Sequence, residues 1–178
     1  MTATMDISVP GVPVPFIRHE TRTFRVGRGF RTEGYEPAYN PNPNPQSKFY
    51  DQQLRWNRLH LWRASIRRFV LAHKPAEPWD CPFSAHLVFY VPRPESLLKP
   101  SSPRGCIPCD KKPDADNYAK VILDTITDCG IWVDDGRVWD LRAVKLYHAM
   151  GCAPGARIRI RARVPASFGA PFLWEQPV

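Results

Sequence analysis

The stretch that most constrains the fold is residues 110–147, DKKPDADNYAKVILDTITDCGIWVDDGRVWDLRAVKLY. Pro113 disfavours helical conformation in the residue before it, so a new element begins near this point. Apolar residues then recur at helical spacing and predict one buried helix face: Tyr118, Ile122 and Ile126. Gly130 is typical of the C-terminal end of a helix. The stretch therefore predicts a helix over 116–127, a turn, and a strand over 138–147.

The same stretch concentrates acidic side chains in a chain whose formal net charge is +8. Asp114 and Asp116 lie two positions apart, and Lys120 follows Asp116 by one helical turn. Asp134 and Asp135 precede the predicted strand. A helix, turn and strand of this length can fold back so that the two acidic pairs meet. Clustered carboxylates repel one another, and a hard cation such as Mg²⁺ relieves the repulsion while taking phosphate oxygens as further ligands.

A structural interpretation fits the same residues. Asp114 would cap the helix, and Asp116 would form a surface ion pair with Lys120. Asp134 and Asp135 would then only shape a turn. The spacing alone leaves both interpretations open.

The remaining sequence predicts one α+β domain that spans residues 1–178. We expect a strand interrupted by proline over 6–16 and a long helix over 47–73 that Ser47 caps. Two further strands are expected over 83–91 and 156–164. Residues 18–46 are basic and rich in Pro, Gly and Asn, so we expect a loop or a disordered arm. Residues 165–178 are expected to form an irregular tail.

Basic residues outnumber acidic ones, with 25 Lys and Arg against 17 Asp and Glu. This balance favours a polyanionic partner, because neutralising phosphates releases counterions. A solvated basic surface without such a partner is the alternative. The side chains expected to contact the phosphates of such a partner are Arg55, Arg58, Arg63, Arg67, Arg68, Lys111, Lys112 and Lys145.

The sequence also bears on location and cysteine chemistry. No apolar run approaches the roughly 20 residues that span a membrane, and the N-terminus lacks the features of a signal peptide. We therefore expect a cytoplasmic protein with reduced thiols, which suits an odd number of cysteines, five. Cys106 and Cys109 form a single C-x-x-C pair without a matching second pair, so we do not expect zinc.

From Pro113 to Lys145 the sequence resembles the RusA family of Holliday junction resolvases, the crossover junction endodeoxyribonucleases. The resemblance rests on the pattern D-x-D-N-x-x-K, a helix, and then W-x-D-D-x-x-V leading into a strand that ends in Lys. It extends less specifically over residues 80–163, and the N-terminal third matches only loosely. The implied fold is α+β: a small mixed sheet, a long helix in the N-terminal half, and a shorter helix that carries the motif.

The resemblance implies roles for individual residues. Asp114, Asp116 and Asp135 would bind the metal, and Lys120 would act with them in catalysis. Asp134 would be an auxiliary ligand or a structural residue. The cofactor would be Mg²⁺, with Mn²⁺ able to substitute.

Members of the family are homodimers, often encoded by phages and prophages. The chain would make paired nicks in four-way DNA junctions during recombination and repair. A non-catalytic basic DNA-binding protein with a structural acidic cluster is the first alternative. A zinc-stabilised interaction module that uses Cys106 and Cys109 is the second.

Overall fold

The computed structural model describes residues 4–17, 20–26, 29–35 and 37–162 of the 178-residue chain. Its centre is a five-stranded sheet with the order β1-β7-β4-β6-β5. The strands are β1 (Thr4–Pro10), β4 (Phe83–Val91), β5 (Ile107–Pro108), β6 (Val138–Tyr147) and β7 (Gly155–Ala162). β4 and β6 are parallel and the other neighbours are antiparallel, so the sheet is mixed.

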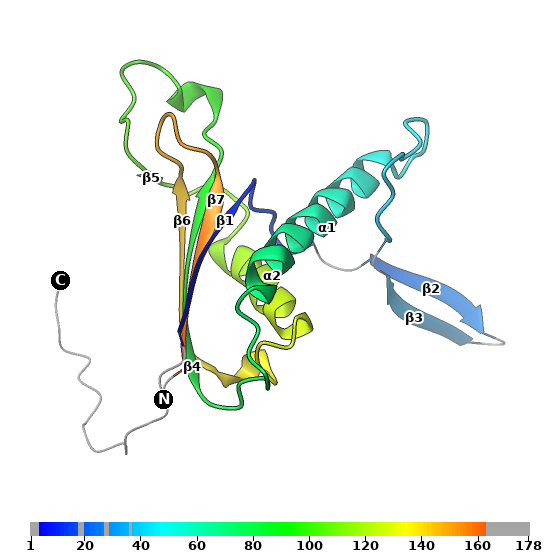
Figure 1. The fold of residues 1–178 in the computed structure, drawn as a ribbon. Coiled ribbons are helices and arrows are strands. Elements are labelled where there is room, and N and C mark those ends of the chain that lie inside the picture. Colours follow the sequence, from blue (N-terminus) through cyan, green and yellow to red (C-terminus); the bar gives the residue numbers. More distant parts are fainter. Residues whose placement is uncertain (1–3, 18–19, 27–28, 36, 163–178) are drawn as a thin grey trace.

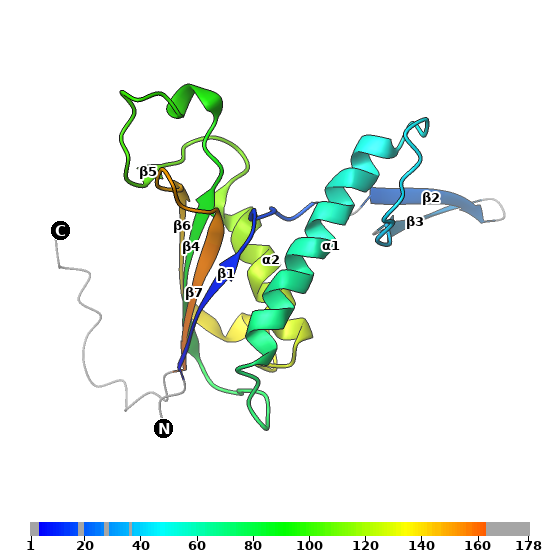
Figure 2. The same ribbon diagram turned by 45° about the horizontal axis from the view of Figure 1, so that its top comes forward.

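Two α-helices, α1 (Tyr50–Leu71) and α2 (Ala115–Asp128), lie on the same face of this sheet (Figures 1 and 2). The parallel pairing of β4 with β6 requires a crossover between them, and α2 lies in that connection. Two 3₁₀ turns complete the order: η1 (Glu95–Leu97) and η2 (Asp135–Arg137). The expected α+β class with a mixed sheet is confirmed. In the part of the chain that the structure describes, no helix is long and apolar enough to cross a membrane.

Alternation along the strands builds the core between the sheet and the helices. In β7, Ile158 and Ile160 are fully buried, whereas the intervening Arg157, Arg159 and Arg161 face the side without helices. The strand therefore has one apolar face and one basic face. From the helices, the core receives Trp56, Leu59, Trp62, Ile66, Val70, Tyr118, Ile122 and Ile126. The helical spacing of the last three residues therefore predicted their burial correctly.

The prediction for residues 18–46 is wrong in its first half. β2 (Glu20–Val26) and β3 (Gly29–Tyr35) pair antiparallel and form a hairpin that projects away from the sheet (Figures 1 and 2). The proline of this range lies entirely at 37–46, while the two strand segments are rich in Thr, Phe, Val and Tyr, which favour strands. Averaging the composition over the whole range concealed this difference.

Residues 37–46 lack regular structure, as predicted, but they are fixed against α1. The side-chain oxygen of Asn57 accepts the backbone N–H of Asn40 at 2.9 Å. The long helix begins at Tyr50, so Ser47 does not cap it. Ser47 instead accepts the N–H of Phe49 at 3.2 Å and shapes the turn before the helix.

Most of the other boundaries differ little from expectation, but β1 ends six residues earlier than the predicted 6–16. β6 begins and ends as predicted, and α2 is one residue longer at each end. Gly130 has φ 66°, the left-handed conformation expected after a helix. β1 ends at Pro10, because the chain then leaves the sheet and crosses α2, where the Phe16 N–H donates to the Asn117 carbonyl at 2.8 Å. The expected tail over 165–178 lies outside the described residues.

Candidate active site

The N-terminus of α2 presents two of the predicted aspartates. Asp114 occupies the N-cap position in extended conformation, but its side chain makes no capping hydrogen bond. Asp116 lies in the first turn, and both residues are exposed. The partial positive charge at a helix N-terminus favours carboxylates there. The Asp114 carboxylate is therefore not used for capping and remains available as an oxygen ligand.

Lys145 fixes the loop that leads into this helix. From β6, its ammonium donates to the backbone carbonyls of Lys111 and Pro113. These two carbonyls immediately precede Asp114 in the chain. Lys145 was predicted to contact DNA, but in the structure its donors hold the loop. Lys111 and Lys112 are exposed, and Lys111 lies 3.8 Å from Asp110.

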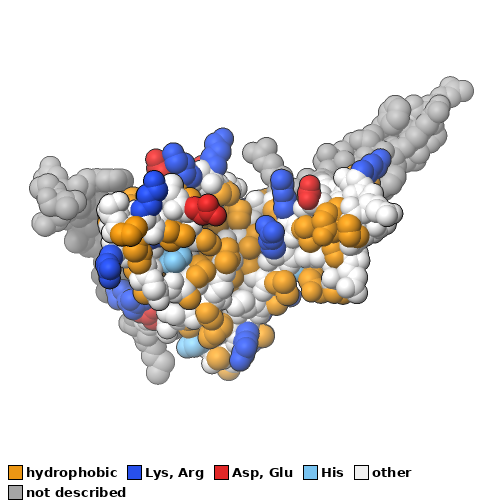
Figure 3. Space-filling model, turned by 90° about the horizontal axis from the view of Figure 1, so that it is seen from above, with side chains coloured by type: hydrophobic (Ala, Val, Ile, Leu, Met, Phe, Trp, Pro, Cys, Tyr) orange, Lys and Arg blue, Asp and Glu red, His pale blue; other side chains and the backbone are white. Residues whose placement is uncertain are grey.

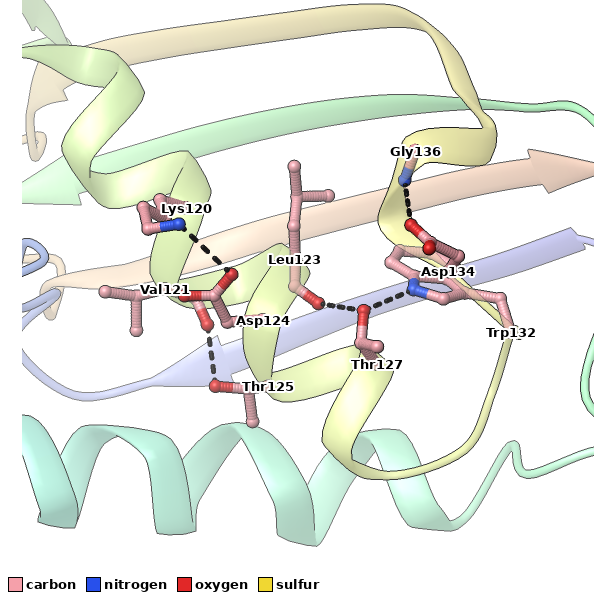
Figure 4. A network of polar contacts seen from close by, with 9 residues as sticks. All are labelled: Lys120, Val121, Leu123, Asp124, Thr125, Thr127, Trp132, Asp134 and Gly136. Atoms are coloured by element: carbon pink, nitrogen blue, oxygen red, sulfur yellow. Dashed lines mark hydrogen bonds and ion pairs between the residues drawn. The ribbon is translucent and has the colours of Figure 1, made fainter.

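The second acidic pair lies in the turn between α2 and β6. Asp134 accepts the backbone N–H of Gly136 at 2.6 Å and caps the short turn η2 (Figure 4). Asp135 is the first residue of η2 and is half-buried. Of the two roles considered for Asp134, the structural one is therefore visible: one of its oxygens stabilises the turn that presents Asp135.

Trp132 anchors this turn to the end of α2. Its indole N–H donates to the Thr127 hydroxyl at 2.6 Å, and Thr127 in turn donates to the Leu123 carbonyl at 3.0 Å (Figure 4). The Trp132 ring stacks on Phe83 of β4, with 4.3 Å between the ring centres. Trp132 is 1% exposed, so these contacts fix the turn from inside the core.

Lys120 pairs with a residue that the sequence analysis did not select. Its Nζ lies 3.6 Å from Oδ1 of Asp124, one turn towards the C-terminus, and the two side chains point towards one another (Figure 4). The expected pairing with Asp116 is therefore replaced by one with Asp124. The i, i+4 spacing from Lys120 was the available signal, but Asp116 has the same spacing on the other side.

Asp124 has an unusual electrostatic environment. Burial raises its pKa, and the nearby charge of Asp135 acts in the same direction, while Lys120 and Arg63 oppose both. The residue thus lies where α1, α2 and the η2 turn come close. Asp124 and Asp135 are near enough to interact, which links the middle of α2 to the second acidic pair.

The described residues contain no group of three or more His, Cys, Asp or Glu side chains already arranged around a metal position. The gathering of Asp114, Asp116 and Asp135 around one ion therefore stays a prediction. Their chemistry suits a hard cation, because all are carboxylates and Asp114 and Asp116 are exposed.

The predicted DNA-binding arginines of α1 do not form one stripe. Arg67 pairs with Asp128 of α2 at 3.2 Å, and Arg63 is close enough to favour the charged form of Asp124. Arg55, Arg58 and Arg68 are exposed. The face seen in Figure 3 likewise carries its Lys and Arg side chains scattered among apolar ones. The charge count of the helix did not reveal that Arg67 pairs with α2.

The cysteines are all free thiols: Cys81, Cys106, Cys109, Cys129 and Cys152. Cys106 is exposed, while Cys109 is half-buried beside Tyr147. A hydrogen bond with Cys109 and burial raise the pKa of Tyr147 to about 12. Cys109 therefore contacts the end of β6, which gives it a structural neighbour in the sheet.

The family model for endodeoxyribonuclease RusA matches residues 35–161, which is more than half of the chain. The matched segment includes both helices, the η2 turn and all the predicted site residues. The two strands of the hairpin lie before it, except for Tyr35. No curated protein matches the chain.

Proposed function

The chain belongs to the RusA family of endodeoxyribonucleases, and on this premise we propose that it is a metal-dependent nuclease that resolves Holliday junctions. The observation that carries the proposal is the arrangement on α2. Asp114 and Asp116 are exposed at its N-terminus, and Lys120 follows within the same helix. The N-cap carboxylate makes no capping bond, so both of its oxygens can bind an ion, whereas a purely structural cap would accept a backbone N–H.

Asp114, Asp116 and Asp135 are the proposed ligands for Mg²⁺, with Mn²⁺ as a substitute. When bound, the ion would orient the phosphodiester and neutralise charge during displacement. The chain's own groups prepare the site for it. Lys145 holds the loop before Asp114, and Asp134 holds the turn that presents Asp135.

Lys120 is the proposed catalytic cation. Its ammonium would stabilise the negative charge that grows on the phosphate oxygens in the transition state. Lys120 is about half exposed, at 52%, so a DNA strand lying over α2 can reach it. Asp114, Asp116 and Lys120 lie on α2, and Asp135 lies in the turn that follows it. The helix therefore fixes the spacing between the first two proposed ligands and the lysine.

Backbone phosphates of branched DNA are the proposed targets of the exposed arginines Arg55, Arg58 and Arg68. Such contacts position the DNA without reading its sequence. Arg157 and Arg159 lie on the face without helices and already pair with Asp6, so we assign them no contact. Paired nicks in a four-way junction need two active sites related by a two-fold axis. We therefore propose a homodimer that acts in recombination and repair in the cytoplasm.

The test is nicking of a labelled four-way junction, titrated with Mg²⁺ and compared with linear duplex DNA of the same sequence. We expect nicking that depends on the metal and favours the junction. Asp116→Asn should abolish cleavage while junction binding persists. Asp110→Asn is the matched control, because Asp110 is exposed and contacts Lys111 in the preceding loop.

Three outcomes would contradict the proposal. Wild-type protein that binds junctions but never nicks them would favour the non-catalytic DNA-binding alternative. Asp116→Asn that cuts at the wild-type rate would remove the assigned site. Close to one equivalent of zinc in protein purified without added metal would favour the zinc-stabilised module, because structural zinc binds tightly.

A further inference from the structure

The ion pair between Lys120 and Asp124 has no part in the roles assigned above. The Lys120 Nζ lies 3.6 Å from Oδ1 of Asp124, and the Asp124 side chain is 27% exposed against 52% for the lysine. The carboxylate is carried on a short side chain that its neighbours enclose. The ammonium ends a flexible four-carbon chain. The carboxylate is therefore the fixed partner, and the ammonium is the group that it can orient.

A second contact restricts the position of the same ammonium. The Lys120 Nζ lies 5.1 Å from the centre of the Phe16 ring. The Phe16 backbone N–H donates to the Asn117 carbonyl at 2.8 Å, which ties the segment after β1 to the first turn of α2. Phe16 is packed against the core. The lysine thus has a ring and a carboxylate at its tip, both supplied by parts of the chain that are themselves held in place.

A stabilising role does not explain this pair well. The neighbouring pair between Arg67 and Asp128 joins α1 to α2 with both side chains half exposed, at 50% and 54%. Such a pair loses little hydration. Asp124 is more enclosed, at 27%, so its charge loses more hydration than that of Asp128 does. A carboxylate enclosed in this way and held against one ammonium is better suited to orient that ammonium than to stabilise the fold.

We propose that Asp124 is a positioning residue that holds the Lys120 ammonium where it can stabilise the phosphate during cleavage. This inference rests on the proposed nuclease function. Asp116, Lys120 and Asp124 succeed one another at i, i+4 and i+8 on one face of α2, so the lysine lies between a proposed metal ligand and its own support. Asp124 keeps the ammonium on this face without contacting the DNA.

The inference predicts which kinetic constant changes. An ammonium that acts on charge developed in the transition state contributes to kcat more than to binding. Misplacing it should therefore lower kcat and leave the affinity for the junction nearly unchanged. A residue that bound the metal would instead change the Mg²⁺ concentration needed for half-maximal nicking.

The experiment is a double-mutant cycle in single-turnover nicking of a four-way junction at saturating Mg²⁺. Asp124→Asn should lower the rate about tenfold to a hundredfold, with junction affinity and the Mg²⁺ midpoint unchanged. In the Lys120→Gln background the same substitution should cause no further loss. Asp124→Glu should recover part of the rate, because it restores the carboxylate. Asp128→Asn, one turn along the helix, is the control and should keep the wild-type rate.

Each other result overturns the inference. A wild-type rate in Asp124→Asn removes the role of Asp124. Equal losses in the wild-type and Lys120→Gln backgrounds show that Asp124 acts independently of the lysine. A several-fold higher Mg²⁺ midpoint makes it a metal ligand. As a control for folding, Asp124→Asn should bind the junction without metal as wild-type protein does. If the wild-type protein nicks no junction, the proposed function fails, which is a different result from a failure of Asp124 alone.

Discussion

Trp132→Phe tests how the core holds the turn that presents Asp135. The substitution removes the indole N–H that donates to Thr127 at 2.6 Å and part of a ring that is 1% exposed. Thr127 keeps its own bond to the Leu123 carbonyl at 3.0 Å, so no buried hydroxyl loses every partner. Losing one hydrogen bond costs about 1 kcal/mol. The smaller ring leaves a void beside Phe83, which costs about 1–2 kcal/mol more.

The free energy of unfolding should therefore fall by about 2–3 kcal/mol, which lowers Tm by about 5–10 °C for a chain of this size. Urea denaturation followed by far-UV circular dichroism measures the first quantity and a thermal scan the second. Trp139→Phe is the matched control, because Trp139 is 48% exposed and its substitution should cost less than about 0.5 kcal/mol. Equal stabilities of the Trp132 variant and wild type would refute the account of the turn.

Further predictions concern the loop, the sheet and the charges. Lys145→Met should lower the nicking rate about tenfold with little change in junction affinity, since it releases the Lys111 and Pro113 carbonyls; weaker binding at an unchanged rate would instead make Lys145 a DNA contact. Gly155→Ala should destabilise the protein by about 2 kcal/mol in urea denaturation, because its Cβ would meet the Val9 carbonyl oxygen at 2.7 Å. Gly105→Ala, which meets nothing within 4 Å, should be neutral. Hydrogen bonds from Arg157 and Arg159 lower the pKa of Asp6, so its contribution is present at neutral pH and lost as the pH falls below about 4. Acid titrations of unfolding should therefore be less steep for Asp6→Asn than for wild type. Arg58→Gln should reduce the salt dependence of junction binding by about one counterion, and Arg67→Gln by less, because Arg67 is paired with Asp128.

The middle of the chain was the most predictable part of the fold. The apolar spacing from Tyr118 to Ile126 fixed both the existence of α2 and its buried face, and β6 was placed with its correct bounds. Local patterns suffice there because each residue's choice of helix or strand agrees with its place in the core. Local pattern failed for the hairpin, where the composition of 37–46 outweighed the strand-favouring residues of 20–35.

Site residues divide in the same way. The motif located Asp114, Asp116, Lys120 and Asp135 by spacing, and the structure places the first three on one helix. Spacing could not choose between Asp116 and Asp124 as the partner of Lys120, since both lie one turn away. Spacing also could not distinguish Arg67, which pairs with Asp128 of α2, from the exposed Arg58.

The sequence by itself determined the elements that carry the proposed chemistry: a helix with carboxylates at its start, a lysine one turn later, and an acidic turn before a strand. These depend on spacing along one chain, and covalent geometry fixes that spacing. Tertiary structure alone decided which partner each charge meets. Lys145 holds a loop 32 residues or more away in sequence, and Arg63 and Asp135 act on the charge of Asp124 from other elements. Such contacts depend on how the layers pack, because electrostatic and hydrogen-bond energies depend on distance in space and not on separation in sequence.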